Sequence, residues 1–135
     1  MTPVTVLLVD DADDCLTTLD LALKQLPGVV LRWAQSAEEA LAVLAEDSVR
    51  AIVTDIQLPK MNGLELIEKV RHEPTRRSLP IVVVSADPDP ATPRNAIELG
   101  ANAFFSKPFS PGAVRKKLEE LIYGVPLPSD ARGMQ

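Results

Sequence analysis

The chain has 135 residues, 46% of them hydrophobic and 24% charged, so it has the length and composition of one globular domain and can bury roughly two-thirds of the surface that it exposes when unfolded. Its formal net charge of −5 provides no positive field that could neutralise phosphates, which argues against direct nucleic-acid binding. The single cysteine, Cys15, excludes an internal disulfide, and because no stretch resembles a signal peptide or could span a membrane, we expect a cytoplasmic protein without a membrane partner.

Strand-like and helix-like segments alternate along the chain. The apolar runs 4–9, 51–55 and 81–85 are typical of central strands in a parallel sheet that is covered on both faces. The more polar runs 29–34 and 102–107 favour the sheet edges. Apolar residues at helical spacing predict a helix after each strand. These helices are expected over 13–26, over 36–47, near 64–70, near 96–99 (marked by Ala96, Ile97 and Leu99) and near 114–122.

Local signals mark several boundaries between these segments. Ser36, with Glu39 three residues later, predicts a capping box at the second helix. Thr92 is expected to cap the fourth helix, with Pro93 in its first turn. Gly63 is expected to permit the backbone conformation that the loop after residue 55 needs.

Regular alternation of strand and helix indicates right-handed crossovers and a sheet between two helical layers. Among the common strand orders, 2-1-3-4-5 places the polar second and fifth strands at the edges. The sequence therefore predicts an α/β, flavodoxin-like, doubly wound sheet of five parallel strands with five helices. We assign this domain to residues 1–123, and residues 124–135 to a flexible C-terminal tail or a truncated linker.

Polar side chains follow four of the predicted strands. Asp10 and Asp11 end the first strand, Asp55 the third, Ser85 the fourth and Lys107 the fifth. The carboxyl ends of parallel strands lie at one edge of a sheet, where ligands of such folds bind. We therefore expect these five side chains to converge on one rim.

Three facing carboxylates repel one another unless a cation joins them. Oxygen ligands with free coordination positions suit Mg²⁺, which takes one or two carboxylates together with waters and a phosphate oxygen. Lys107 adds a point charge and Ser85 a hydroxyl donor. The set describes a pocket for a phosphoryl group, with the central carboxylate, Asp55, as the nucleophile.

Four short motifs in register resemble the receiver domain of two-component response regulators. They are "VDD" at 9–11, "D-x-x-L-P-x-M-N-G" at 55–63, "SA" at 85–86 and "KPF" at 107–109. The resemblance covers about residues 4–122. It implies that Asp55 accepts a phosphoryl group from a phosphohistidine of a sensor histidine kinase or a histidine phosphotransfer protein. It also implies a signalling protein whose only catalysis is its own phosphorylation and dephosphorylation.

The resemblance assigns roles to the surrounding residues. Asp10, Asp11 and Asp55 would hold Mg²⁺ together with the backbone carbonyl of Gln57. Lys107 would contact the acyl phosphate, and the Lys107–Pro108 peptide would be cis.

The resemblance also implies a switch pair, Ser85 and Phe104, that reshapes a face for a downstream protein partner. This face comprises the fourth helix, fifth strand and fifth helix, and a phosphorylation-dependent homodimer is left open. Phe104 stands where the family often has tyrosine, so it has no phenolic hydroxyl. Gln57 and Asp87 stand where the family varies in a way that resembles tuning of the dephosphorylation rate.

Two rival functions stay open at this stage. In a haloacid-dehalogenase-like phosphatase the nucleophile would be Asp11, the first acid of the pair Asp11-x-Asp13 after the first strand, and Asp55 would have no role. A degenerate receiver would bind partners without phosphorylation, although the complete set of site residues speaks against it. The domain could be a stand-alone regulator or part of a longer protein.

Structural interpretations compete with the functional ones. Asp10 and Asp11 could merely cap the first helix, and Lys107 could be a surface lysine. We assign other chemistry-bearing residues to structural roles: Asp13 and Asp14 to capping the first helix, His72 to a solvated helix end, Cys15 to a partly buried position without redox function, and Trp33 and Phe105 to packing.

Overall fold

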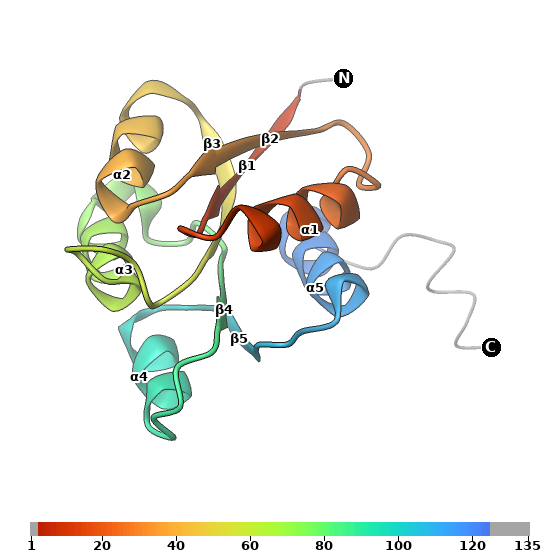
Figure 1. The fold of residues 1–135 in the computed structure, drawn as a ribbon. Helices are drawn as coiled ribbons and strands as arrows, with labels where there is room; N and C mark the ends of the chain where they lie inside the picture. Colours follow the sequence, from red (N-terminus) through yellow and green to blue (C-terminus); the bar gives the residue numbers. More distant parts are fainter. Residues whose placement is uncertain (1–2, 125–135) are drawn as a thin grey trace.

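The computed structural model describes residues 3–124, which form a parallel sheet between two layers of helices (Figure 1). The strand order is β2-β1-β3-β4-β5, as the sequence predicts. In chain order the elements are β1 (Val4–Val9), α1 (Asp13–Leu23), β2 (Val29–Ala34), α2 (Ala37–Glu46), β3 (Val49–Thr54), α3 (Gly63–His72), the 3₁₀ turn η1 (Pro74–Arg76), β4 (Ile81–Ser85), α4 (Thr92–Leu99), β5 (Ala103–Ser106) and α5 (Pro111–Tyr123).

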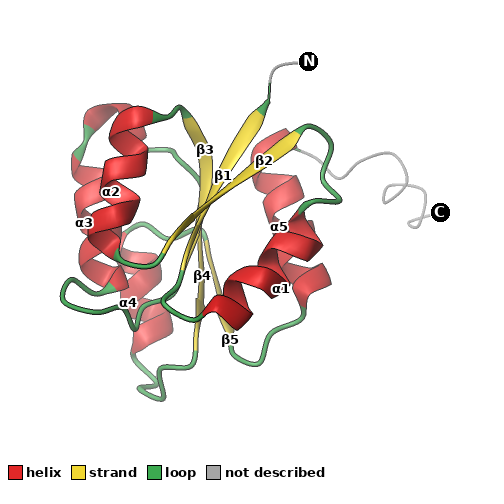
Figure 2. Cartoon of the chain, turned by 45° about the horizontal axis from the view of Figure 1, so that its top comes forward, coloured by secondary structure: helices red, strands yellow, loops and turns green. Residues whose placement is uncertain are grey.

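Each face of the sheet has its own hydrophobic core. Helices α2, α3 and α4 cover one face, and α1 and α5 cover the other (Figure 2). Neighbouring residues of one strand therefore enter different cores: Leu7 packs toward α2 and α3, whereas Leu8 packs toward α1 and α5. Both side chains are fully buried. This two-sided burial explains why the central strands are uninterrupted apolar runs.

The limits of several elements differ from those that the sequence predicts. β3 begins at Val49 and ends at Thr54, so Asp55 lies just beyond the strand. α1 ends at Leu23, although Leu26 beyond it is still buried.

Among the described residues, no helix is both long and apolar enough to cross a membrane. The tail expected from residue 124 falls, except for Gly124, outside the described residues.

Of the two expected caps, one is partly confirmed and the other is wrong. Ser36 Oγ accepts a hydrogen bond from the Glu39 backbone N–H, but Glu39 Oε1 accepts from the Gln35 N–H, so the capping box is half formed. Thr92 is not the cap of α4, because it lies inside the first turn and Ala91 precedes it as the N-cap.

Ile97, one of the apolar residues that mark α4 in the sequence, is 47% exposed. The eight-residue helix instead turns Thr92 and Ala96, one helical turn apart, toward the protein, and this leaves Ile97 rotated toward solvent. The helix that these residues mark is confirmed, but its apolar residues do not all face the core.

A complete capping box, which the sequence analysis did not identify, begins α3. Asn62 Oδ1 accepts from the Glu65 N–H at 3.0 Å, and Glu65 Oε1 accepts from the Asn62 N–H at 3.1 Å. This reciprocal pair satisfies two backbone donors and defines where the helix begins. It therefore also defines the length of the loop that follows Asp55.

Gly63 is needed because the backbone of residues 55 and 56 passes too close to its Cα for any side chain, and not because its own backbone has an unusual conformation. A Cβ atom at this position would lie 2.2 Å from the Asp55 backbone oxygen and 2.7 Å from Ile56 Cα. The Gly63 N–H also donates to the Ile56 carbonyl at 2.8 Å. The left-handed backbone position of this loop is Lys60, with φ of 64°. The α3 N-terminus thus packs directly on the backbone that carries Asp55.

We expect Gly63→Ala to lower the free energy of unfolding by about 2 kcal/mol, because the backbone around Asp55 must move to admit the methyl group. Gly112→Ala is the matched control, since its Cβ would meet nothing closer than 3.9 Å. Because alanine favours a helix more than glycine, the control should gain about 0.5 kcal/mol. Urea unfolding measures both, and equal stabilities for the two variants would contradict this account.

Candidate functional site

Backbone hydrogen bonds continue past the strand ends and position the predicted site residues. The Asp10 N–H donates to the Ala34 carbonyl at 3.0 Å, and the Asp55 N–H donates to the Val9 carbonyl at 2.9 Å. The Lys107 N–H donates to the Ser85 carbonyl at 2.8 Å. The sheet itself therefore sets the positions from which these side chains extend.

Lys107 joins the two central carboxylates. Its Nζ lies 2.9 Å from Asp10 Oδ2 and 2.9 Å from Asp55 Oδ2, although the three residues are far apart in the sequence. The side chains of Asp10 and Asp55 are 1% and 5% exposed, and that of Lys107 is 22% exposed. Lys107 directly follows Ser106, the last residue of β5. The predicted convergence is confirmed for these three charged groups.

The environment keeps Lys107 charged. Burial alone lowers the pKa of its ammonium group, but hydrogen bonds to Asp10 and Asp55 and their negative charges outweigh burial, so the pKa is raised above the usual lysine value. One positive charge faces two carboxylates, which leaves the cluster of these three side chains with a net negative charge. The site can therefore still attract a cation.

The other carboxylate oxygens are bound by the backbone. Asp10 Oδ1 accepts from the Ala12 N–H at 2.9 Å, and Asp55 Oδ1 accepts from the Gln57 N–H at 3.1 Å. Asp10 thus bonds Ala12 while its second oxygen contacts Lys107. These bonds fix the orientation of both carboxylates. The N-cap of α1 is Ala12 and has no side-chain cap hydrogen bond, so the interpretation of Asp10 and Asp11 as caps of this helix is wrong.

Asp11 does not join this cluster in the described structure. Its side chain is exposed, and among residues 3–124 no three histidine, cysteine or acidic side chains are arranged to hold a metal ion. Two facing carboxylates nevertheless fit Mg²⁺, which needs only one or two from the protein when phosphate oxygens and waters complete its shell. The donor chemistry therefore suits a magnesium ion at Asp10 and Asp55.

The two residues of the expected switch lie on adjoining strands. Ser85 is buried at the end of β4, and its Oγ accepts a hydrogen bond from the Asp87 N–H at 3.1 Å. Phe104 is half-buried on β5, opposite Val83 of β4, and packs against the core beneath α2, α3 and α4. The Lys107–Pro108 peptide is cis, as the resemblance implies.

Cys15 lies beside the site. It helps line a cavity of about 300 Å³ beside Lys107 and Pro108. Burial first, and then a hydrogen bond to Asp10 and the charge of that carboxylate, raise the pKa of the thiol to about 12. A raised pKa disfavours the thiolate, which is the reactive form, and this agrees with the assigned structural role. Its position after Asp10, in the first turn of a helix, was the only sequence signal for this proximity.

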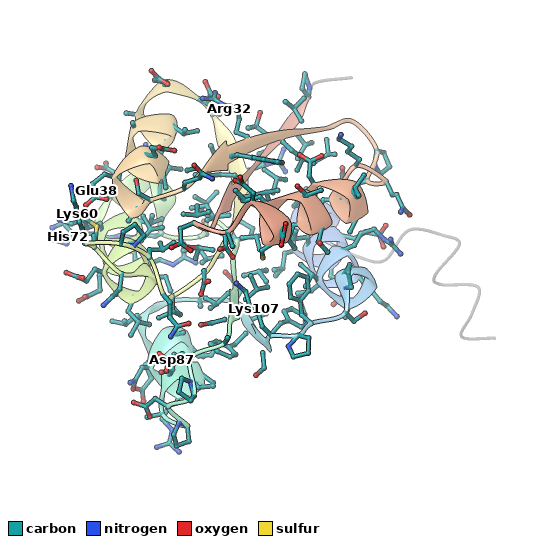
Figure 3. All side chains as sticks on the ribbon, in the orientation of Figure 1. Arg32, Glu38, Lys60, His72, Asp87 and Lys107 are labelled. Carbon is teal, nitrogen blue, oxygen red and sulfur yellow. The ribbon has the colours of Figure 1, made fainter. Side chains whose placement is uncertain are left out.

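The remaining candidates lie outside the cluster. His72 is exposed at the end of α3, away from Lys107 (Figure 3). Asp13 accepts a hydrogen bond from the Gln35 side chain and lies within the first turn of α1, which Ala12 rather than Asp13 caps. Trp33, expected to pack, is instead 42% exposed and donates from Nε1 to Asp20 Oδ2 at 2.8 Å, because β2 is an edge strand.

Comparison with known proteins gives a consistent result. The family model for the response regulator receiver domain matches residues 6–119. A chemotaxis protein CheY homolog of Campylobacter jejuni is 32% identical over 86% of this chain and 90% of its own length. Chemotaxis protein CheY1 of Helicobacter pylori is 30% identical over 86% of this chain and 94% of its own length.

Solved structures show the same relationship. A putative response regulator from Chloroflexus aurantiacus has a TM-score of 0.83 and 33% identity, and the match covers 90% of this chain and 99% of that one. The chemotaxis response regulator CheY4 of Vibrio cholerae has a TM-score of 0.79 and 27% identity, with 89% and 99% covered.

We expect Lys107→Met to lower the free energy of unfolding by about 3 kcal/mol at neutral pH, because it leaves two buried carboxylates without their cation. Lys117→Met, which removes only a surface pair with Glu120 at 3.7 Å, is the control and should cost less than about 1 kcal/mol. Denaturant unfolding of both variants measures the difference.

The pH dependence is set by the raised pKa of Lys107. A raised folded-state pKa gives stability that is fully present below the unfolded value, about 10.4, and is lost as the pH rises through the folded value. The loss caused by Lys107→Met should therefore be equal at about pH 7 and about pH 9, and smaller above about pH 11. A loss that vanishes by about pH 9 would contradict this assignment.

Proposed function

This chain belongs to the response regulator receiver domain family, and from that premise we propose that Asp55 accepts a phosphoryl group from a phosphohistidine of a histidine kinase or a histidine phosphotransfer protein. The observation that carries the proposal is the single ammonium group of Lys107 at 2.9 Å from both Asp55 and Asp10. Such a cluster offers a carboxylate nucleophile next to a fixed positive charge.

The geometry suits transfer to a carboxylate. An Asp55 oxygen attacks phosphorus, the bond from phosphorus to the histidine nitrogen breaks, and the imidazole leaves with a proton. Lys107 neutralises charge on the oxygens of the transferred group, as positively charged groups do in phosphoryl transfer generally. The Gln57 N–H, which holds Asp55 Oδ1, keeps the nucleophile oriented.

The proposed magnesium ligands are the carboxylates of Asp10, Asp11 and Asp55 and the backbone carbonyl of Gln57. When bound, the ion would neutralise charge on the phosphoryl oxygens. Asp10 and Asp55 already face each other across Lys107, and the exposed side chain of Asp11 is free of the core and can turn. Lys107 then limits repulsion between the two carboxylates before the ion arrives.

The proposed switch pairs Ser85 with Phe104. The phosphoryl oxygens on Asp55 would accept a hydrogen bond from the Ser85 hydroxyl and draw the loop after β4 inward. Phe104, half-buried on the neighbouring strand, would turn into the space that this movement opens. The surface formed by α4, β5 and α5 would then change shape for a downstream protein, as a shift between two populations.

The phosphatase alternative has less support. Asp11 is exposed, and Asp13 is engaged by Gln35, whereas Asp55 contacts Lys107. The nucleophile that the alternative needs therefore lies outside the charged cluster. Steady hydrolysis of a phosphomonoester would favour this rival, and a single stoichiometric transfer favours the receiver.

With Mg²⁺ and a small phosphodonor such as acetyl phosphate, the intact mass of the protein should rise by one phosphoryl group. Asp55→Asn should abolish this gain while the protein stays folded, because an amide is a poor nucleophile. Asp14→Asn is the control, since it makes the same chemical change at an exposed carboxylate in the first turn of α1. An unchanged mass for the parent, or an unchanged gain in Asp55→Asn, would refute the proposal.

Mg²⁺ alone should stabilise the folded protein, because the ion binds carboxylates that only the fold brings together. A concentration about five times the dissociation constant should add about 1 kcal/mol, which raises Tm by roughly 4 °C. Asp10→Asn should remove most of this shift. Glu38→Gln, at an exposed acid of α2 that Figure 3 shows away from Lys107, should keep it. Equal shifts in both variants would place the ion elsewhere.

A further inference from the structure

We propose that the side chains of Asp87 and Thr92 form a latch that connects Ser85 to the first turn of α4, and that this latch transmits a change at Asp55 to α4. The inference rests on the proposed function, because it concerns the response of the fold to phosphorylation. Asp87 and Thr92 act as positioning residues, since neither of them contacts the charged cluster of Asp10, Asp55 and Lys107.

Asp87 is the hub of the loop between β4 and α4. Its N–H donates to Ser85 Oγ at 3.1 Å, and its Oδ2 accepts from Thr92 Oγ1 at 3.1 Å. Its Oδ1 accepts from the Asp89 N–H at 2.9 Å. One residue therefore bonds the strand end, the loop and the helix start.

Thr92 is the first residue of α4, and its hydroxyl is buried rather than exposed to solvent. The residue is 4% exposed, and its Oγ1 donates to Asp87. The N-cap of α4 is Ala91, whose side chain has no acceptor for the helix N–H groups. The carboxylate of Asp89 accepts from the Ala91 N–H and that of Asp87 from the Thr92 hydroxyl, so both negative charges lie at the positive end of this helix without forming a side-chain cap.

The loop is stiff enough to carry a displacement. Prolines at 88, 90 and 93 restrict φ at half of the positions 88–93, and Pro93 lies in the first turn of α4. Proline also lowers the number of conformations open to such a loop. A movement of Asp87 should therefore move Thr92 with it rather than be absorbed between them.

Ser85 can take part in both sets of interactions at once. A hydroxyl has one proton to donate and two lone pairs to accept. The bond from the Asp87 N–H uses one lone pair of Ser85 Oγ, so the proton is still available for a phosphoryl oxygen on Asp55. Ser85 can thus be drawn toward Asp55 while it keeps Asp87, and through Asp87 it draws the first turn of α4.

The test combines intact mass with amide hydrogen exchange of α4, with and without Mg²⁺ and acetyl phosphate. In the parent, phosphorylation should change the exchange of residues 94–99. Thr92→Val, which removes the hydroxyl and keeps the volume, should gain the same phosphoryl group but lose this response. Thr92→Ser restores the hydroxyl and should restore the response. Thr18→Val, at an exposed threonine of α1, is the matched control and should respond like the parent.

The unphosphorylated protein gives an independent test of the latch. Loss of a hydrogen bond to a carboxylate should make exchange at the start of α4 about tenfold faster in Thr92→Val and at least as fast in Asp87→Ala, which removes the acceptor of both Thr92 and Asp89. The double variant should be no faster than Asp87→Ala alone, because Thr92→Val removes no bond that Asp87→Ala leaves in place. Additive effects in the double variant would overturn the latch.

The outcomes separate the two proposals. A parent that gains no phosphoryl group refutes the proposed function, and the inference fails with it. A parent that is phosphorylated without a response in α4, or a Thr92→Val variant that is phosphorylated and responds like the parent, overturns the latch alone. A response that is lost with valine and restored with serine supports it, because a merely structural role would not depend on the hydroxyl.

Discussion

One ammonium group that faces two buried carboxylates is the interaction on which the site depends. Burying Asp10 and Asp55 side by side is unfavourable, and Lys107 offsets their repulsion with two contacts of 2.9 Å. The repulsion is only partly offset, because one positive charge faces two negative charges. The remaining negative charge makes the rim suited to a cation, and the carboxylate next to the ammonium suited to a phosphoryl group.

The rest of the fold holds these charges in place. Ladder bonds that continue beyond β1, β3 and β5 fix the backbone of each charged residue, and a separate core on each face of the sheet keeps the strands from shifting. The close packing of Gly63 against the Asp55 carbonyl adds a third restraint, because α3 then begins on the backbone of the acceptor. These restraints hold the backbone of the charged residues in place. The loop after Ser85 instead connects the site to the proposed output face, because Asp87 bonds both Ser85 and the start of α4.

Much of this arrangement could be predicted from the residues in order. Uninterrupted apolar runs predicted the central strands, polar runs predicted the edges, and together they gave the strand order. Because strand ends of a parallel sheet meet at one rim, the positions of Asp10, Asp55 and Lys107 also predicted their meeting. Helix details were harder: the box at Asn62 was overlooked, and Thr92, expected to cap α4, lies inside its first turn.

The sequence by itself determined the class of the fold and which charged residues would share a rim, because both depend on periodicity and on positions at strand ends. Only the tertiary structure decided which of them touch. Lys107 binds Asp10 and Asp55 while Asp11 faces solvent, and Cys15 lies beside the cluster. Such choices depend on side-chain directions and on distances of a few ångströms, which are set by packing between segments far apart in the chain and which leave no periodic trace in the sequence.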